Sequence, residues 1–205
     1  MSQAVPRTRH DDIFVGFKPI DDLHREFQDI VDALNDPAEA DYGEHLLALH
    51  EHMLRHTALE EQYMLQENYP HYGVHKREHD RFVERLADMG RWMKANGESI
   101  WGTQASPFAK TPWGRCTQKL TDGGATLYLH VFQWPSDGQL LVPGLRNKVT
   151  GAYLLSDPAK KALPTKAVES GVSVQVPTTA PDPISSVVVL DVSGPLEIEG
   201  TVPAQ

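Results

Sequence analysis

Apolar residues recur every three or four positions in three stretches within the first 97 residues, and this period predicts three amphipathic helices. The first begins near Pro19, a residue favoured at the first position of a helix. The second covers residues 42–67, and the third covers residues 71–96. The third ends before Gly97, because glycine tolerates the left-handed conformation that closes many helices.

Beyond residue 100 the pattern changes to short β-rich runs separated by Gly, Pro, Asp and Ser. The runs are ATLYLHVF, QLLVPG, VTGAYLLS, GVSVQVP and SSVVVLDVSG, and their spacing is typical of an antiparallel β-sandwich. TDGGAT is interpreted as a hairpin turn, with glycine supplying a positive φ. The sequence therefore predicts an α+β chain of two domains, a helical domain at residues 1–97 and a β-sandwich at residues 98–205.

Five polar residues interrupt the apolar faces of the predicted helices. They are His24 on the first helix, His56 and Glu60 on the second, and His75 and His79 on the third. Any one of these histidines alone fits a core residue that is hydrogen-bonded to a neighbour. Together the five favour a metal site, because a buried glutamate is costly without a cation and no Lys or Arg lies on the inward faces at that level. Imidazole and carboxylate ligands suit iron, zinc or manganese.

Two further histidines, His50 and His52, flank the inward face of the second helix. Either is close enough in sequence to His56 to add a ligand to the metal site. We interpret both as exposed surface histidines, because the flank of a helix tolerates polar side chains without any function.

The composition narrows the classes of protein that the chain can belong to. Its net charge of −9 argues against a nucleic-acid partner, because such proteins carry excess Lys and Arg for the phosphates. No apolar run reaches the ~18 residues of a membrane span, and the N-terminus lacks the apolar core of a secretory signal. We therefore expect a cytoplasmic protein with no membrane partner. The lone Cys116 cannot form an internal disulfide.

The segments IDDLHREF, HTALEEQYM and YPHYGVHKREHDRF resemble the first three helices of the hemerythrin family, over about residues 13–84. The resemblance implies an up-down helical bundle that holds two non-haem irons bridged by carboxylates, with an open position on one iron for dioxygen. Carried over by position, it implies that His24 and His56 bind one iron, bridged by Glu60 to the other. His75 and His79 are then the ligands of the second iron.

The fourth helix of that family brings a histidine and, five residues later, a bridging aspartate, but no such HxxxxD follows His79. The one later histidine, His130, lies in a strand-like run. The expected fold is therefore an incomplete bundle of three helices, and a mononuclear iron site is preferred over a dinuclear one. The expected function is binding of non-haem iron, with dioxygen or redox sensing as an extension.

A second resemblance covers about residues 88–199. It is to the C-terminal domain of bacterial α-L-fucosidases of the retaining type, and it is carried by NGESIWGTQASPF, TPWGRCTQK, LYLHVFQWPSDGQLLVPGLRNKVTGAYLLSD and APDPISSVVVLDVSG. The catalytic carboxylates of that family lie on a (β/α)₈ barrel of ~250 residues, for which this sequence has no room, so we expect no enzymatic activity.

The alternative function is that of a fucosidase-derived module for carbohydrate contact or packing, with the helices as a passive appendage. Sugar-stacking aromatic residues would carry such contact, and the candidates are Trp101, Trp113, Tyr128 and Trp134. Large aromatic side chains in a small sandwich are more often part of the core, which is the interpretation preferred here.

An incomplete bundle should leave an apolar slot where the fourth helix is missing. We expect its lining to include Leu23, Phe27, Met53, Phe82 and Leu86. A large exposed apolar patch rarely stays bare in a soluble monomer, so something should cover it. The candidates are the chain's own sandwich, the segment DDIFVGF and a second copy of the chain, and the sequence favours a homodimer through this face.

Overall fold

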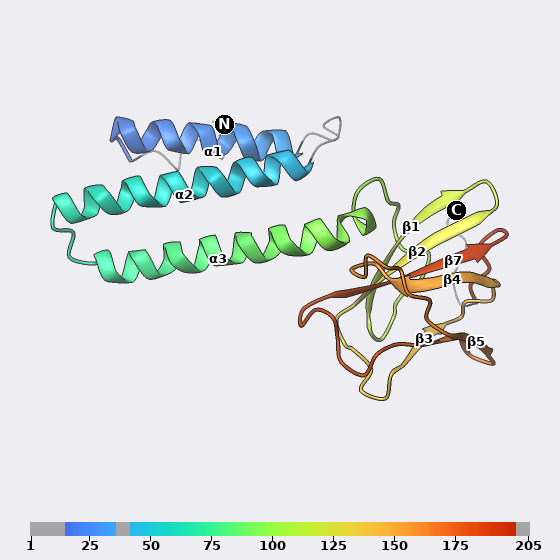
Figure 1. Cartoon of the computed structure of the whole chain (residues 1–205). Coiled ribbons are helices and arrows are strands. Elements are labelled where there is room, and N and C mark those ends of the chain that lie inside the picture. The colour runs from blue at the N-terminus through green and yellow to red at the C-terminus, as the bar shows by residue number, and fades with distance from the viewer. Residues whose placement is uncertain (1–14, 36–41, 200–205) are drawn as a thin grey trace, which may run out of the picture. The chain divides into compact units, whose positions relative to one another are not determined.

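A computed structural model describes residues 15–35 and 42–199 of the chain. The chain divides between Lys94 and Ala95 into two compact units, one helical and one built from β-strands. This α+β arrangement confirms the predicted fold class of three helices followed by antiparallel sheets (Figure 1).

Three helices form the first unit: α1 (Lys18–Asn35), α2 (Tyr42–Gln66) and α3 (Tyr72–Asn96). Each begins within one residue of its predicted start, and α2 and α3 end within one residue of their predicted ends, because the helical period continues through each segment. α2 ends where Asn68 adopts a φ of 52° and the N–H of Tyr69 donates to the carbonyl of Met64 at 2.8 Å. None of the helices in the described ranges is long and apolar enough to cross a membrane.

The helices are held together in two different ways. α1 packs directly against α2, where Leu49 is buried and Arg55 forms an ion pair with Glu26 of α1. α3 reaches α2 through polar side chains, among them the contacts of His79 and Lys76 with the carboxylates of α2. The polar residues that the sequence placed on inward faces therefore join two helices.

Seven strands form the second unit, after a 3₁₀ turn at Gly97–Ser99. One sheet has the order β1-β2-β7-β4 and the other has the order β3-β6-β5, with antiparallel pairing throughout. The strands are β1 (Gly114–Thr121), β2 (Gly124–Val131), β3 (Gln139–Pro143), β4 (Val149–Leu154), β5 (Thr165–Val168), β6 (Gly171–Gln175) and β7 (Ser186–Ser193). Fully buried residues of both sheets, such as Leu127, Val174 and Leu190, share one core.

The predicted β-rich runs correspond to β2, β3, β4, β6 and β7, and the sequence missed β1 and β5. Both missed strands lie at the edge of a sheet. An edge strand is paired on one side only and tolerates polar side chains, and GRCTQKLT and TKAV lack an apolar run. The other two edge strands, β3 and β4, were recognised because QLLVP and VTGAYL keep one. Cys116 of β1 is buried in the core, which raises the pKa of its thiol to about 12.

The predicted hairpin turn joins β1 to β2, since Thr121 pairs with Gly124. The reason given for its glycine was wrong, because Gly123 is not among the residues with positive φ. Glycine is required one position later by a close approach. A Cβ atom on Gly124 would lie 1.9 Å from the carbonyl oxygen of Val192 in β7, whereas one on Gly123 would meet nothing within 4 Å.

This contrast gives a test on two neighbouring residues. Gly124→Ala should lower the free energy of unfolding of the β unit by about 2 kcal/mol or more, because the clash is with backbone that cannot move aside. The control Gly123→Ala should change it by less than about 1 kcal/mol. Urea unfolding followed by tryptophan fluorescence measures both, and equal effects of the two substitutions would contradict the close approach of β2 to β7.

Candidate metal centre

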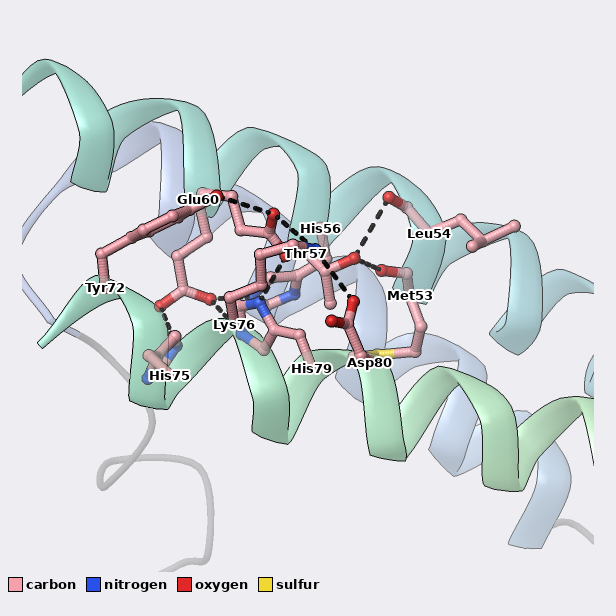
Figure 2. A network of polar contacts seen from close by, with 11 residues as sticks. Met53, Leu54, His56, Thr57, Glu60, Tyr72, His75, Lys76, His79 and Asp80 are labelled. Carbon is pink, nitrogen blue, oxygen red and sulfur yellow. Dashed lines mark hydrogen bonds and ion pairs between the residues drawn. The ribbon is translucent and has the colours of Figure 1, made fainter.

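A carboxylate of α2 faces two imidazoles of α3. The Oε1 atom of Glu60 lies 3.2 Å from Nε2 of His75, and its Oε2 atom lies 3.2 Å from Nε2 of His79. The two histidines are one turn apart on α3, so their rings lie beside each other with centroids 4.3 Å apart. Figure 2 shows the three side chains pointing toward one another across the space between the helices.

The other two predicted ligands, His56 and His24, lie beside this group, at a greater distance from its centre. Nε2 of His56 lies 3.6 Å from Oε2 of Glu60, and the ring of His24 lies 5.1 Å from the ring of His56. Only Glu60, His75 and His79 have donor atoms that all lie within 4.8 Å of one another, and no second group of this kind occurs in residues 15–35 and 42–199. The structure therefore brings three of the five predicted residues to one point and places His56 and then His24 next to it.

Glu60 is kept ionised by its surroundings. The imidazole of His56, 3.6 Å away, has the largest effect and lowers the pKa of the Glu60 carboxyl, whereas burial raises it by a smaller amount. Electrostatic attraction to His79 and His75 lowers it further. The nearest ammonium group, Nζ of Lys76, contacts Glu61 and Asp80 instead. Glu60 thus presents a carboxylate whose partners are imidazoles, as expected from the absence of Lys and Arg on this face.

The spacing of these donors fits a single metal ion. Nitrogen and oxygen ligands bind first-row metals at about 2.0–2.2 Å, so two adjacent ligands of one ion lie roughly 3.0–3.4 Å apart. Both Glu60–imidazole distances, 3.2 Å, fall within that range. His56 also has a buried Nδ1 atom without a hydrogen-bond partner in the part of the chain that the structure describes. The donor set suits iron, zinc or manganese.

Sequence reasoning missed Glu61, the residue after Glu60. Its Oε1 atom lies 3.4 Å from Nδ1 of His79, on the opposite side of the ring from Glu60. The other oxygen of Glu61 lies 3.3 Å from Nζ of Lys76 and accepts a hydrogen bond of 3.5 Å from the hydroxyl of Tyr72. Tyr72, Lys76 and His79 recur at i, i+4 and i+7 on α3, which is the sequence signal that identifies Glu61 as their common partner.

His52 is not the exposed histidine that the sequence suggested. Its side chain is fully buried between α1 and α2, with Nδ1 3.3 Å from Oε2 of Glu26 and the ring 6.0 Å from that of Phe27. Burial lowers its pKa, against the opposing effect of Glu26. The expectation failed because the stripe of α2 that faces α1 is wider than the apolar period implied, and it includes the position one turn before His56.

A groove of about 790 Å³ runs along the site, lined by all three helices. It contains Phe27, Met53 and Phe82, as expected for the slot, together with His24, His56 and His79. Leu23 and Leu86 do not line it, and Glu78, Arg81 and Arg85 do. The slot is therefore more charged than predicted, because long side chains of α3 reach into it.

Comparisons with known proteins find similarity to the hemerythrin family and to fucosidases. The Hemerythrin HHE cation binding domain matches residues 15–122, which include all three helices and β1. The bacteriohemerythrin of Methylococcus capsulatus is 35% identical over 100 residues, which are 47% of this chain and 74% of that protein.

The chain is also similar to fucosidases. The alpha-L-fucosidase of Dictyostelium discoideum is 30% identical over 110 residues, which are 50% of this chain and 23% of that protein. A solved structure of alpha-L-fucosidase from Vibrio sp. strain EJY3 matches 58% of this chain and 21% of its own, with 26% identity and a TM-score of 0.46. The chain thus spans about a quarter of the length of the fucosidases it matches.

The family match covers more than half of the chain and includes every residue of the candidate metal centre. The similarity to alpha-L-fucosidases covers about half of the chain, which is consistent with a fusion of a hemerythrin part and a fucosidase-like part. The chain belongs to the hemerythrin HHE cation binding domain family.

Proposed function

We propose that the helical unit binds one non-haem iron ion through Glu60, His75 and His79. The observation that carries this proposal is the carboxylate of Glu60, 3.2 Å from Nε2 of each histidine. Two imidazoles and one carboxylate are the ligand set of many non-haem iron(II) sites, in which the remaining positions stay open. Iron(II) held in this way supplies one-electron chemistry and a position where dioxygen binds.

A single ion is preferred over a pair. His24 and His56 lie next to the group, but a second ion there needs further ligands. His130, the one histidine after His79, is buried in β2 with Nε2 3.2 Å from Oγ1 of Thr117. His24 and His56 therefore act as neighbours of the site, where the imidazole of His56 lies 3.6 Å from the carboxylate of Glu60 and lowers its pKa.

Glu61 fixes the orientation of His79 in this proposal. A ligand imidazole that binds through Nε2 must carry its proton on Nδ1, and Glu61 accepts from that nitrogen. Lys76 and Tyr72 hold the carboxylate in place from its other oxygen. The groove beside His24, His56 and His79 gives a small molecule access to the site, which supports dioxygen or redox sensing as the extension of iron binding.

For the β unit we propose a non-catalytic role in packing. Two of the aromatic residues considered for sugar contact belong to its interior. The indole N–H of Trp113 donates to the carbonyl of Leu141 at 2.7 Å, and the buried hydroxyl of Tyr128 donates to Glu98 at 2.8 Å, with burial raising the pKa of Tyr128. Neither ring offers a face for stacking on a sugar.

Metal content tests the main proposal. Protein made in iron-sufficient medium should hold about one iron per chain, and Glu60→Gln or His79→Ala should lose most of it. The control His71→Ala replaces an exposed histidine at the start of the same helix region and should keep the metal. Metal analysis of the purified proteins gives the answer, and a well-folded parent protein that takes up no added iron would falsify the proposal.

The same binding should depend on pH. Affinity should fall by tenfold or more below about pH 6, because protonated imidazole cannot bind a metal. Glu60 does not account for a loss at this pH, since its pKa is lowered and it stays ionised. Competition with a chromophoric chelator at several pH values measures the affinity, and a constant affinity between pH 7 and 5 would exclude imidazole ligands.

Replacement of Glu61 tests whether this residue orients His79, because Glu61 is not itself a proposed metal ligand. Glu61→Ala should weaken metal binding by about 10–100-fold, and Glu61→Gln by less, since an amide oxygen still accepts from Nδ1. Asp80→Asn is the matched control, because Asp80 contacts Lys76 and does not contact His79. Cobalt(II) absorption reports both affinity and geometry, and an unchanged spectrum and affinity in Glu61→Ala would show that Glu61 does not position His79.

No hydrolysis of an aryl α-fucoside is expected, because retaining glycosidases need two carboxyl groups about 5–5.5 Å apart on either side of the bond that is cleaved. The assay compares the purified chain with a preparation from cells that lack it. Turnover above that background, lost on replacement of one Asp or Glu of residues 98–205, would overturn the non-catalytic role.

A further inference from the structure

One stripe of α3 is exposed and carries large apolar side chains. Its members are Val74, Glu78, Phe82, Arg85 and Met89, and all five are exposed. They follow at intervals of four, four, three and four residues, so they lie within an arc of ~80° over a length of ~22 Å. The apolar members are 55%, 44% and 53% exposed at Val74, Phe82 and Met89, which is a high exposure for such side chains.

From either end, this stripe has the same order of apolar, charged and aromatic residues. The only difference is that the acid and the base exchange places. From its start it has an apolar residue, an acid, an aromatic residue, a base and an apolar residue. When two copies of α3 run antiparallel about a two-fold axis near Phe82, Val74 faces Met89 of the second copy. In the same register Glu78 faces Arg85 of the second copy, and the two Phe82 side chains meet at the axis. Such self-complementarity is what a two-fold interface requires.

The flank of the stripe repeats this complementarity. Arg77 and Asp88 lie on one side of it, both exposed, and the same antiparallel register brings Arg77 of one copy near Asp88 of the other. Arg85 has no ion pair within the described ranges, and Glu78 is paired only with Arg81, in an exposed contact of 3.1 Å on its own helix. An exposed pair of that kind is weak, so it leaves Glu78 able to pair across the interface.

The groove beside the stripe adds apolar surface to the same face. Glu78, Phe82 and Arg85 line the groove from α3, and Phe27 and Met53 line it from α1 and α2. A partner with a uniformly apolar or singly charged helix would leave Glu78 or Arg85 facing no opposite charge, whereas a second α3 satisfies both.

We propose that the chain forms a two-fold dimer in which the exposed stripes of two antiparallel α3 helices pack against each other. The interface consists of Val74 with Met89, Glu78 with Arg85, and Phe82 with Phe82. It contains none of the proposed iron ligands, so dimerisation does not require iron and its test is independent of the metal test.

Charge reversal at two positions tests the register directly. The full chain should sediment as a dimer at micromolar concentration. Glu78→Arg and Arg85→Glu should each weaken dimerisation by tenfold or more, because each places like charges opposite one another twice per dimer. The double variant Glu78→Arg with Arg85→Glu should restore the affinity to within about threefold, since it exchanges the two charges and keeps the complementarity. Phe82→Asp should abolish the dimer.

Controls distinguish this interface from loss of folding or a contact elsewhere. Lys94→Glu reverses an exposed charge on the face of α3 opposite the stripe and should leave dimerisation unchanged. Helix content from circular dichroism should be the same in all variants. A monomeric parent chain at about 100 μM overturns the proposal. So does a dimer that survives Phe82→Asp, or a double variant that is folded and fails to recover.

Discussion

The helical unit depends on a carboxylate shared between two helices. Glu60 of α2 lies between His75 and His79 of α3, and the backbones of these two helices approach each other at fewer points than those of α1 and α2 do. A buried carboxylate with only imidazoles as partners is stable while they supply positive charge or while a metal ion does. The position of α3 is thus coupled to the ionisation and metal content of one small group. Structural metal sites commonly couple binding to folding in this way.

The two units differ in what stabilises them. Residues of both sheets, such as Leu127 and Val174, are fully buried in the β unit, which is the usual result of packing two antiparallel sheets. The helical unit buries few apolar side chains, among them Ile20 and Leu49, and many of its contacts are between charged or polar groups. The β unit therefore has its own hydrophobic core, while the helical unit relies on polar contacts that a cation completes.

The features that could be predicted from the sequence are those that a single helix or strand encodes. The helices were predictable because their period is long and regular, and five strands because each contains a recognisable apolar run. β1 and β5 were not, since GRCTQKLT and TKAV lack such a run, whereas the other edge strands, β3 and β4, keep one. Within the site, His75 and His79 were predictable from their spacing on one helix. The contact of Glu61 with His79 and the burial of His52 depend on how neighbouring helices are packed, which no single helix encodes.

α3 belongs to both units, because it begins at Tyr72 and ends at Asn96, beyond the division at Lys94. Its last residues are anchored, since Asn96 is buried and the carbonyl of Ser99, in the turn that follows, accepts a hydrogen bond of 2.5 Å from Thr117 of β1. Its first turns contact α2 through the polar groups around His75 and His79. Local opening should therefore start at the Tyr72 end, and amide hydrogen exchange along α3 should slow toward Asn96. The resistance of α3 to local opening therefore increases along its length. It is greatest where the helix enters the β unit, and at the other end it depends on the partners of His75 and His79.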